Sequence, residues 1–131
     1  MPFVRIDVLS ERNADRLPAL GDAVHEALVE TIGIPGDDLF QLLNAHESGR
    51  LRYDPQYLGV RRDDDIVFVS ITMGRGRTDD QKTALYKRIT ELVQERTGVE
   101  PRNVLINVTE NGFADWSFGE GEAQRLLAGR A

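Results

Sequence analysis

The sequence has no cysteine, a single tryptophan and no long apolar run. Without cysteine the chain cannot form disulfides, use a thiolate nucleophile or build a cysteine metal site. No apolar stretch approaches the roughly 20 residues that a helix needs to cross a bilayer. The start of the chain also lacks the basic and apolar regions of a signal peptide. We therefore expect a cytoplasmic protein that does not associate with membranes.

Basic residues are outnumbered as well. The chain carries 16 Lys and Arg against 22 Asp and Glu, which gives a formal net charge of −6. Such a surface repels phosphate backbones, so nucleic acid is not an expected partner. His25 and His46 have no ligand-like spacing with each other or with a carboxylate cluster, so no metal site is expected. An acidic protein that binds an anion needs a local group of arginines.

The length of 131 residues fits one domain, spanning residues 1–131. Within it the chain repeats itself, because shifting the sequence by 65 positions aligns identical residues. These pairs include Phe3 with Phe68, Val4 with Val69, Ile6 with Ile71, Arg12 with Arg77, Leu20 with Leu85 and Gly33 with Gly98. The repeats cover about 2–48 and 66–112 and are followed by a C-terminal extension, 113–131.

Each half is predicted to form a strand, a helix and a second strand. In the first half we expect a strand over 3–8, a helix from near Asp15 that ends at Gly33, and a strand over 39–46. In the second half we expect strands over 66–73 and 104–108. The helix between them begins with a capping box of Thr78 and Gln81 and ends at Gly98.

Two strand–helix–strand units predict an α/β (α+β) fold, a four-stranded mixed sheet with two helices on one face. The opposite face would then lie open. Leu43, Val67 and Val69 are expected on that face and are too apolar for water. Packing against other subunits would cover them, so we expect a homo-oligomer.

Pro2 is the first candidate for chemistry. Methionine is commonly removed before a small second residue, which would leave Pro2 with a free secondary amine. An α-amino group titrates near 7.7–8.0 in model compounds, so its surroundings can make it a base, an acid or a nucleophile. The alternative is a proline without a catalytic role.

Arg75 and Arg77 lie in a Gly-Arg-Gly-Arg run between a predicted strand and the second helix. Alternate residues of an extended chain face the same way, so both guanidiniums can converge on one carboxylate. The helix N-terminus beside them adds favourable potential for an anion. The alternative is a pair of solvated loop arginines. The run lacks the Walker lysine and the dinucleotide-binding spacing.

Two further segments complete the set of candidates. Asp38 follows a Pro-Gly turn and either serves that turn or holds an ammonium group or water. Trp116 and Phe118 belong to the run Ala-Asp-Trp-Ser-Phe-Gly, outside the repeat. This run either closes the core, contacts another subunit or forms an apolar wall beside the site.

These features together resemble the tautomerase superfamily and, within it, the malonate semialdehyde decarboxylase group. The resemblance covers nearly the whole chain: the Met-Pro start, Gly-Ile-Pro before Asp38, Arg-Gly-Arg before Thr-Asp-Asp-Gln-Lys, and Asp-Trp-Ser-Phe-Gly. It implies a homotrimer of duplicated β-α-β units with an amino-terminal proline in each active site.

The resemblance also implies roles for individual residues. Pro2 would act as a cation, Arg75 and Arg77 would bind the carboxylate of the substrate, and Asp38 would support catalysis. Trp116 and Phe118 would form a hydrophobic wall. One departure stands out, because Arg125 occupies a position where another aromatic of that wall is expected.

The implied activity is that of a lyase, a carboxy-lyase that needs no cofactor. It would convert a small β-keto acid, malonate semialdehyde, to acetaldehyde and carbon dioxide. Two other enzyme classes stay open: a tautomerase (isomerase) of 2-oxo acid enols with neutral Pro2 as the base, and a hydratase or dehalogenase of 3-substituted acrylic acids. A trimeric anion-binding module is the non-enzymatic alternative.

Overall fold

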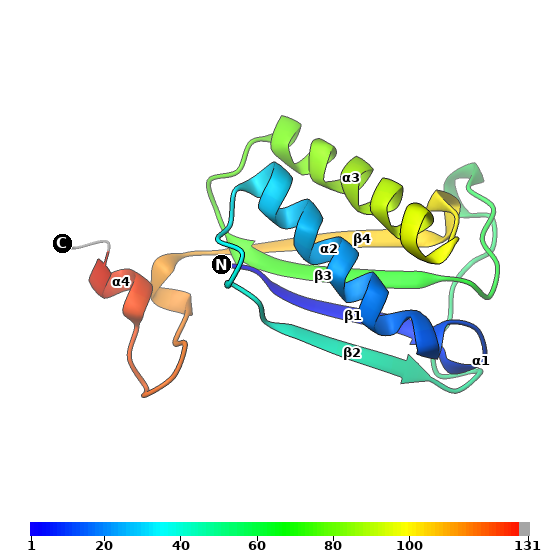
Figure 1. Ribbon diagram of the computed structural model, residues 1–131, viewed down its shortest axis with the longest axis horizontal. Helices are drawn as coiled ribbons and strands as arrows, with labels where there is room; N and C mark the ends of the chain where they lie inside the picture. Colours follow the sequence, from blue (N-terminus) through cyan, green and yellow to red (C-terminus); the bar gives the residue numbers. More distant parts are fainter. Residues whose placement is uncertain (129–131) are drawn as a thin grey trace.

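A computed structural model describes residues 1–128 of the chain (Figure 1). The last three residues of the expected C-terminal extension, 129–131, lie outside the described part. In chain order the helices and strands are β1 (Phe3–Leu9), α1 (Ser10–Asn13), α2 (Leu17–Ile32), β2 (Gln41–His46), β3 (Val67–Gly74), α3 (Asp79–Thr97), β4 (Val104–Asn111) and α4 (Gln124–Ala128).

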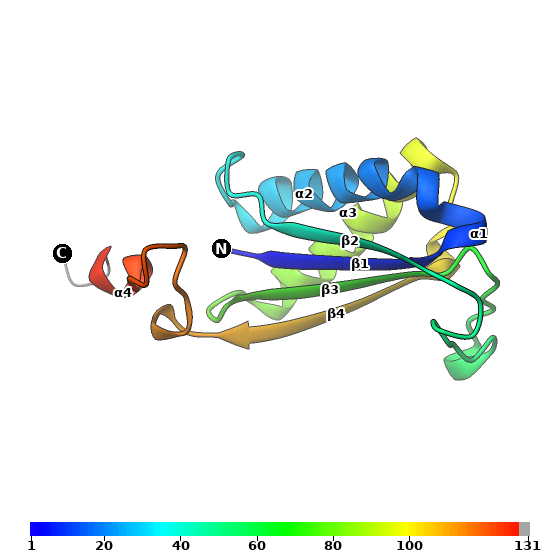
Figure 2. The same cartoon turned by 90° about the horizontal axis from the view of Figure 1, so that it is seen from below.

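The four strands form one mixed sheet in the order β2-β1-β3-β4. β1 pairs with β2 and β3 with β4 in parallel, whereas β1 and β3 run antiparallel at the centre. α2 and α3 cover one face of this sheet and leave the other face open (Figure 2). The predicted fold class is therefore confirmed.

The internal repeat of the sequence is also present in the register of the strand pairs. Val4 lies opposite Gln41, and 65 positions later Val69 lies opposite Ile106. The central pairing of Val4 with Ile71 maps onto that of Val69 with Ile6 in the same way. A pseudo-twofold axis between β1 and β3 thus exchanges the two halves.

The helix ends follow the local sequence. Gly33 and Gly98 both adopt left-handed backbone, with φ of 79° and 77°, and end α2 and α3. The predicted capping box of Thr78 and Gln81 is confirmed. The first long helix begins at Leu17 rather than near Asp15, because α1 and a 3-10 turn precede it and leave the proline in its first turn.

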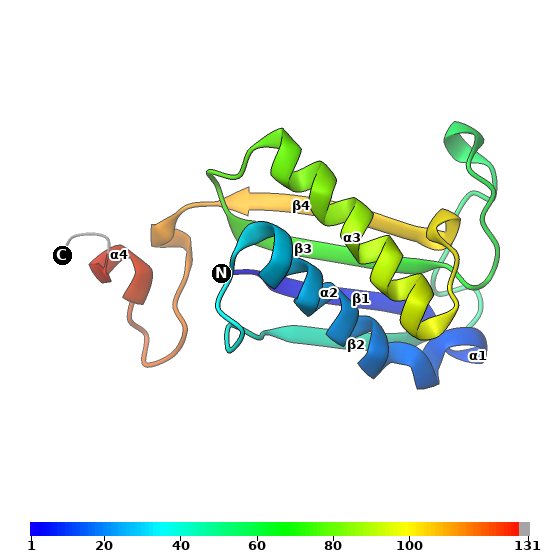
Figure 3. The same ribbon diagram turned by 45° about the horizontal axis from the view of Figure 1, so that its top comes forward.

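The core lies between the sheet and the two helices (Figure 3). The prediction that Val67 and Val69 lie on the open face is wrong, because both are buried beneath the helices, at 0% and 1% exposed. Leu43 lies opposite buried Ile6 and therefore also faces the helix side. The apolar alternation of β3 marks the core face of the strand.

The open face is mixed in character. Its exposed apolar side chains are Phe3, Leu42 and Leu105, at 40%, 49% and 43% exposed. Between them lies a charged cluster, in which Asp7 accepts hydrogen bonds from Arg5 Nε at 2.9 Å and from His46 Nε2 at 2.5 Å. Burial raises the pKa of Asp7, but the hydrogen bonds from Arg5 and His46 outweigh it, and the net pKa is lowered from 3.8.

The Asp7 cluster makes stability dependent on pH. At neutral pH, Asp7→Asn should lower the free energy of unfolding by about 1–3 kcal/mol, because hydrogen bonds to a buried charge are lost. Since the folded-state pKa of Asp7 lies below its unfolded value, this stabilisation is present above about pH 4 and is lost as the pH falls through the folded pKa. Urea unfolding over a pH series, at one protein concentration, measures the difference.

Asp22→Asn is the matched control, because Asp22 is exposed on α2 and the same charge is removed. It should change the free energy of unfolding by less than about 0.5 kcal/mol. A gap between Asp7→Asn and the parent that widens on acidification would contradict the assignment.

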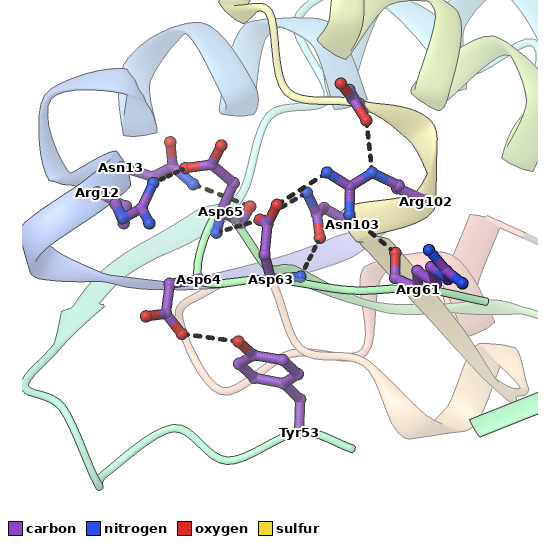
Figure 4. Close-up of polar contacts among 10 residues, drawn as sticks. Arg12, Asn13, Tyr53, Arg61, Asp63, Asp64, Asp65, Arg102 and Asn103 are labelled. Carbon is purple, nitrogen blue, oxygen red and sulfur yellow. Dashed lines mark hydrogen bonds and ion pairs between the residues drawn. The ribbon is translucent and has the colours of Figure 1, made fainter. Parts of the chain in front are cut away.

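The end of the sheet farthest from the N-terminus is tied together by polar contacts (Figure 4). Asp63 accepts hydrogen bonds from Asn103 Nδ2 at 3.0 Å and from Arg102 Nη2 at 2.8 Å. Tyr53 donates to Asp64 at 2.7 Å, which raises the pKa of Tyr53 to about 12. These contacts fix the long connection between β2 and β3. Across residues 1–128, no helix combines the length and apolar character that membrane crossing demands.

Candidate active site

The beginning of the chain is held by a carboxylate. The α-ammonium nitrogen of Met1 lies 3.0 Å from Asp38 Oδ2, and the two side chains are only 7% and 14% exposed. Pro2 is buried directly before β1, and its nitrogen lies in the peptide bond with Met1. The N-terminal amine of Met1 and Asp38 therefore form the centre of a candidate site.

The loop between α2 and β2 carries Asp38. Gly33 turns the chain out of the helix, and the Asp38 N–H donates to the Pro35 carbonyl at 3.1 Å. His25 on α2 lies with Nε2 2.7 Å from the Gly36 carbonyl, and donates to it in the Nε2-protonated tautomer. His25 thus anchors this loop to the helix, which keeps Asp38 close to the N-terminal amine.

A cavity of about 500 Å³ opens beside this ion pair. Its lining combines charged and apolar side chains: Met1, Gly33, Ile34, Pro35, Asp38, Phe40, Arg77, Phe118 and Arg125. The volume lies within the range of ligand-binding pockets. Among residues 1–128, no ion pair engages Arg77 or Arg125, so both guanidiniums are available to an anion.

Arg75 lies elsewhere. It lines a second cavity, of about 240 Å³, with Gly74, Asn111, Gly112 and Phe113. The expectation that Arg75 and Arg77 face the same way required an extended chain, and Gly76 interrupts it with φ of 118°. The Arg75 N–H meanwhile donates to the Asn111 carbonyl at 2.7 Å, extending the pairing of β3 with β4. Within one chain the two guanidiniums therefore line different cavities.

Glu110 at the end of β4 lies near Arg75. Lys82 donates a short hydrogen bond to the Glu110 carboxylate, and this bond is the largest cause of a lowered pKa of Glu110. Arg75 adds a smaller favourable charge interaction, whereas desolvation opposes the shift. Glu110 therefore stays ionised near Arg75.

An aromatic wall borders the main cavity. Trp116 and Phe118 stack with ring centroids 5.3 Å apart and an interplanar angle of 1°, and Phe40 meets Phe118 at 5.5 Å. Trp116 donates from Nε1 to Asn111 Oδ1 at 2.7 Å, which fixes the stack to the end of β4. Phe118 lines the cavity, and Trp116 supports it from behind.

Sequence reasoning missed Phe40 and Phe113. Phe40 lines the main cavity and lies just before β2, where it was read as the beginning of a strand. Phe113 lines the Arg75 cavity and is 48% exposed. The sequence signal that could have found it is its place directly before the Ala-Asp-Trp-Ser-Phe-Gly run, which was already a candidate wall of the site.

The arrangement suits a small organic acid. It offers an amine with a carboxylate partner, guanidiniums for an anion and an aromatic surface that excludes water. In the part of the chain that the structure describes, no group of three or more His, Asp and Glu side chains is placed to hold a metal ion.

Comparison with known proteins relates this geometry to a family. A family model described as tautomerase enzyme matches residues 38–119, and a second with the same description matches residues 2–61. Over 126 residues the chain is 38% identical to the probable tautomerase YusQ of Bacillus subtilis, covering 96% of this chain and 99% of that protein.

Two solved structures are similar over nearly the whole fold. One is a malonate semialdehyde decarboxylase described with decarboxylase and hydratase activities, at 31% identity and a TM-score of 0.89, covering 97% of this chain and 98% of that one. The other is the FG41 malonate semialdehyde decarboxylase inhibited by 3-bromopropiolate. It has 38% identity and a TM-score of 0.89, and the match covers 97% of this chain and 96% of that one.

Proposed function

Because the chain belongs to the tautomerase family, we propose that it is an acid-processing enzyme whose catalytic group is the amine of Pro2, exposed by removal of Met1. The observation that carries this proposal is the position of the chain end, 3.0 Å from Asp38 in the cavity lined by Arg77. Met1 now fills space between Asp38 and Gly74, with its Cε 3.5 Å from the position of a Cβ on Gly74. Its loss would enlarge the cavity next to the Pro2 nitrogen.

The proposed reaction is decarboxylation of a 3-oxo acid, with malonate semialdehyde giving acetaldehyde and carbon dioxide. The bond between the carboxylate and C2 breaks, and its electron pair moves into the C2–C3 bond as the aldehyde carbonyl accepts electrons. Protonated Pro2 would stabilise the resulting enolate, or Pro2 would form an iminium that accepts the electrons. A proton then returns to C2. The two solved decarboxylases at 31% and 38% identity support this choice.

The other site residues have distinct proposed roles. Arg77 would bind the departing carboxylate and hold it out of the carbonyl plane, which aligns the breaking bond with the acceptor. Arg75, which lines the neighbouring cavity of the same chain, would contribute less to this binding. Asp38 would hold the Pro2 ammonium in place. Phe118, supported by Trp116, would favour release of neutral carbon dioxide over retention of a charged carboxylate.

Tautomerisation of a 2-oxo acid enol is the second candidate, supported by the 38% identity to a probable tautomerase. It requires neutral Pro2 as a base, so titration of the Pro2 amine discriminates the two reactions. A pKa of the Pro2 amine well below neutral favours a base and hence tautomerisation. A raised pKa favours an acid and hence decarboxylation. Addition of water to a 3-substituted acrylic acid is a third reaction for the same groups. Retention of Met1 would favour a non-catalytic anion-binding module, because the Pro2 nitrogen then stays acylated.

We also propose that the chain works as a homotrimer. The apolar side chains Phe3, Leu42 and Leu105 on the open face of the sheet need a cover, and another subunit would supply it. Sedimentation equilibrium tests this assembly directly. A monomer at micromolar concentration would contradict the proposal and leave the cavity of a single chain as the whole site.

The first experiment measures acetaldehyde release from malonate semialdehyde, coupled to NADH oxidation by an alcohol dehydrogenase. The protein is first weighed by mass spectrometry to confirm loss of Met1. We expect turnover on the order of 1–10³ per second, the usual range of enzymes. Absence of acetaldehyde, together with ketonisation of a 2-oxo acid enol by the same protein, would favour the tautomerase.

A further inference from the structure

Arg125 gives the main cavity a second guanidinium that has no ion-pair partner among residues 1–128. It lines the same cavity of about 500 Å³ as Arg77, the chain end and Asp38. Among the lining residues that the structure describes, Asp38 alone carries a carboxylate, and it is already paired with the N-terminal ammonium at 3.0 Å. The two guanidiniums therefore remain without an anionic partner among the described residues. One carboxylate of a bound acid neutralises one of them and leaves the other.

The position of Arg125 is fixed by its neighbours. Its guanidinium carbon lies 5.6 Å from the centroid of the Phe113 ring, within cation–π distance. Gln124, the first residue of α4, accepts a hydrogen bond from the Phe118 N–H at 2.9 Å and donates to the Gly119 carbonyl at 2.8 Å. These hydrogen bonds attach α4 to the aromatic wall. Together with the contact to Phe113, they hold Arg125 at the cavity.

We infer that Arg125 is a specificity-determining residue that binds a second anionic group, so that the preferred substrate is a short dicarboxylic oxo acid. This inference rests on the proposed function for the reaction at the other end of the substrate. Arg77 would bind one carboxylate near the amine, and Arg125 would bind the other at the side of the cavity formed by Phe118 and α4. Arginine suits this task, because its planar fork pairs with a carboxylate through two hydrogen bonds.

Such a substrate can lose carbon dioxide without an added oxidant, reductant or other co-reactant. Oxaloacetate is malonate semialdehyde with a second carboxylate in place of the aldehyde hydrogen. Loss of carbon dioxide from its C4 breaks the C3–C4 bond, sends the electron pair to the C2 carbonyl and, after C3 gains a proton, gives pyruvate. The carboxylate on C1 is retained throughout, and it is this group that Arg125 would bind.

Binding of two matched acids tests the inference without requiring turnover. Isothermal titration calorimetry compares 2-oxoglutarate with 4-oxopentanoate, in which a methyl group replaces the carboxylate next to the keto group. The parent protein should bind 2-oxoglutarate about tenfold or more tightly. Arg125→Met should abolish this preference and leave the Kd of 4-oxopentanoate within about twofold, whereas Arg77→Met should weaken the binding of both acids. Equal binding of the two acids by the parent protein would overturn the inference.

Arg50→Met is the charge-matched control, because Arg50 is exposed after β2, at the other end of the sheet, and should leave the preference unchanged. Loss of the preference in Arg50→Met as well would reduce the effect to net charge and overturn the assignment. A parallel assay compares kcat/KM for oxaloacetate and malonate semialdehyde, whose ratio should fall about tenfold in Arg125→Met. If neither acid is decarboxylated, the proposed reaction fails, and the calorimetry still decides the role of Arg125.

Discussion

Pro2→Ala protein that has lost Met1 should decarboxylate malonate semialdehyde about 10²-fold or more slowly than the parent, chiefly through kcat. Alanine keeps an amine at the beginning of the chain, but the ring that fixes the nitrogen relative to β1 is gone. The primary amine also differs in basicity from the secondary amine of proline. Coupled NADH oxidation measures the rate, and the mass of each protein reports whether Met1 is absent.

A protein that retains Met1 provides the sharper comparison. Its Pro2 nitrogen is acylated and can neither carry a proton nor form an iminium, so its activity should be no higher than that of Pro2→Ala. Pro101→Ala is the matched control, since Pro101 is exposed at the beginning of a 3-10 turn before β4, and this variant should keep the parental rate. Full activity in protein shown to retain Met1 would rule out the amine as the catalytic group.

Arg77→Met should lower kcat/KM by about 10²–10³-fold, because the carboxylate of the substrate loses a charge-assisted partner in a partly dry cavity. Methionine preserves the length and the apolar stem of the side chain, so the loss reports on the guanidinium. Arg75→Met should cost only about tenfold, since Arg75 lines the neighbouring cavity with Gly112 and Phe113. Initial rates over a range of substrate concentrations separate the effects on kcat and KM.

The double variant then decides whether the two arginines act on one anion. Independent action predicts that the two losses multiply, whereas a shared carboxylate predicts a smaller combined loss. Equal losses in the single variants would mean that Arg75 reaches the substrate after all, through movement of the loop around Gly76 or through a site shared between subunits. That result would contradict the prediction that Arg77 contributes more to catalysis than Arg75.

The sequence predicted the features that depend on local chemistry. Thr78 and Gln81 lie three residues apart, the spacing that a capping box requires. Gly33 and Gly98 end their helices because both positions require a left-handed backbone. The duplication was visible because it preserves the apolar alternation of the strands. Features of this kind need no knowledge of what lies across the fold.

The failures concern direction rather than type. The apolar residues of β3 were recognised, but alternation alone does not say which face the helices cover, and Val67 and Val69 were placed on the wrong one. The sequence predicts that Arg75 and Arg77 face the same way, because the positive φ of Gly76 cannot be read from its identity. Phe40 was absorbed into a strand because its role depends on contact with Phe118, 78 positions away.

The pseudo-twofold axis also means that the chain carries a second position equivalent to its candidate active site. A shift of 65 positions sends Asp38 to Asn103 and Arg77 to Arg12, at the opposite end of the sheet (Figure 4). There Asn103 exchanges hydrogen bonds with Asp63, and Arg12 pairs with Asp65 at 3.5 Å. The position that corresponds to Pro2 is Val67, whose nitrogen lies inside the continuous chain.

A duplicated chain has only one beginning. Two unlinked half-length chains would present a terminal amine at both ends of such a sheet, whereas their fusion leaves one end without the group on which the chemistry depends. That end is then released from catalytic constraint, and here a carboxamide and buried hydrogen bonds stand where a carboxylate and an open cavity stand at the other. If the proposed catalytic role of the Pro2 amine holds, fusion would halve the number of reactive ends and let the remaining one diverge in its choice of substrate.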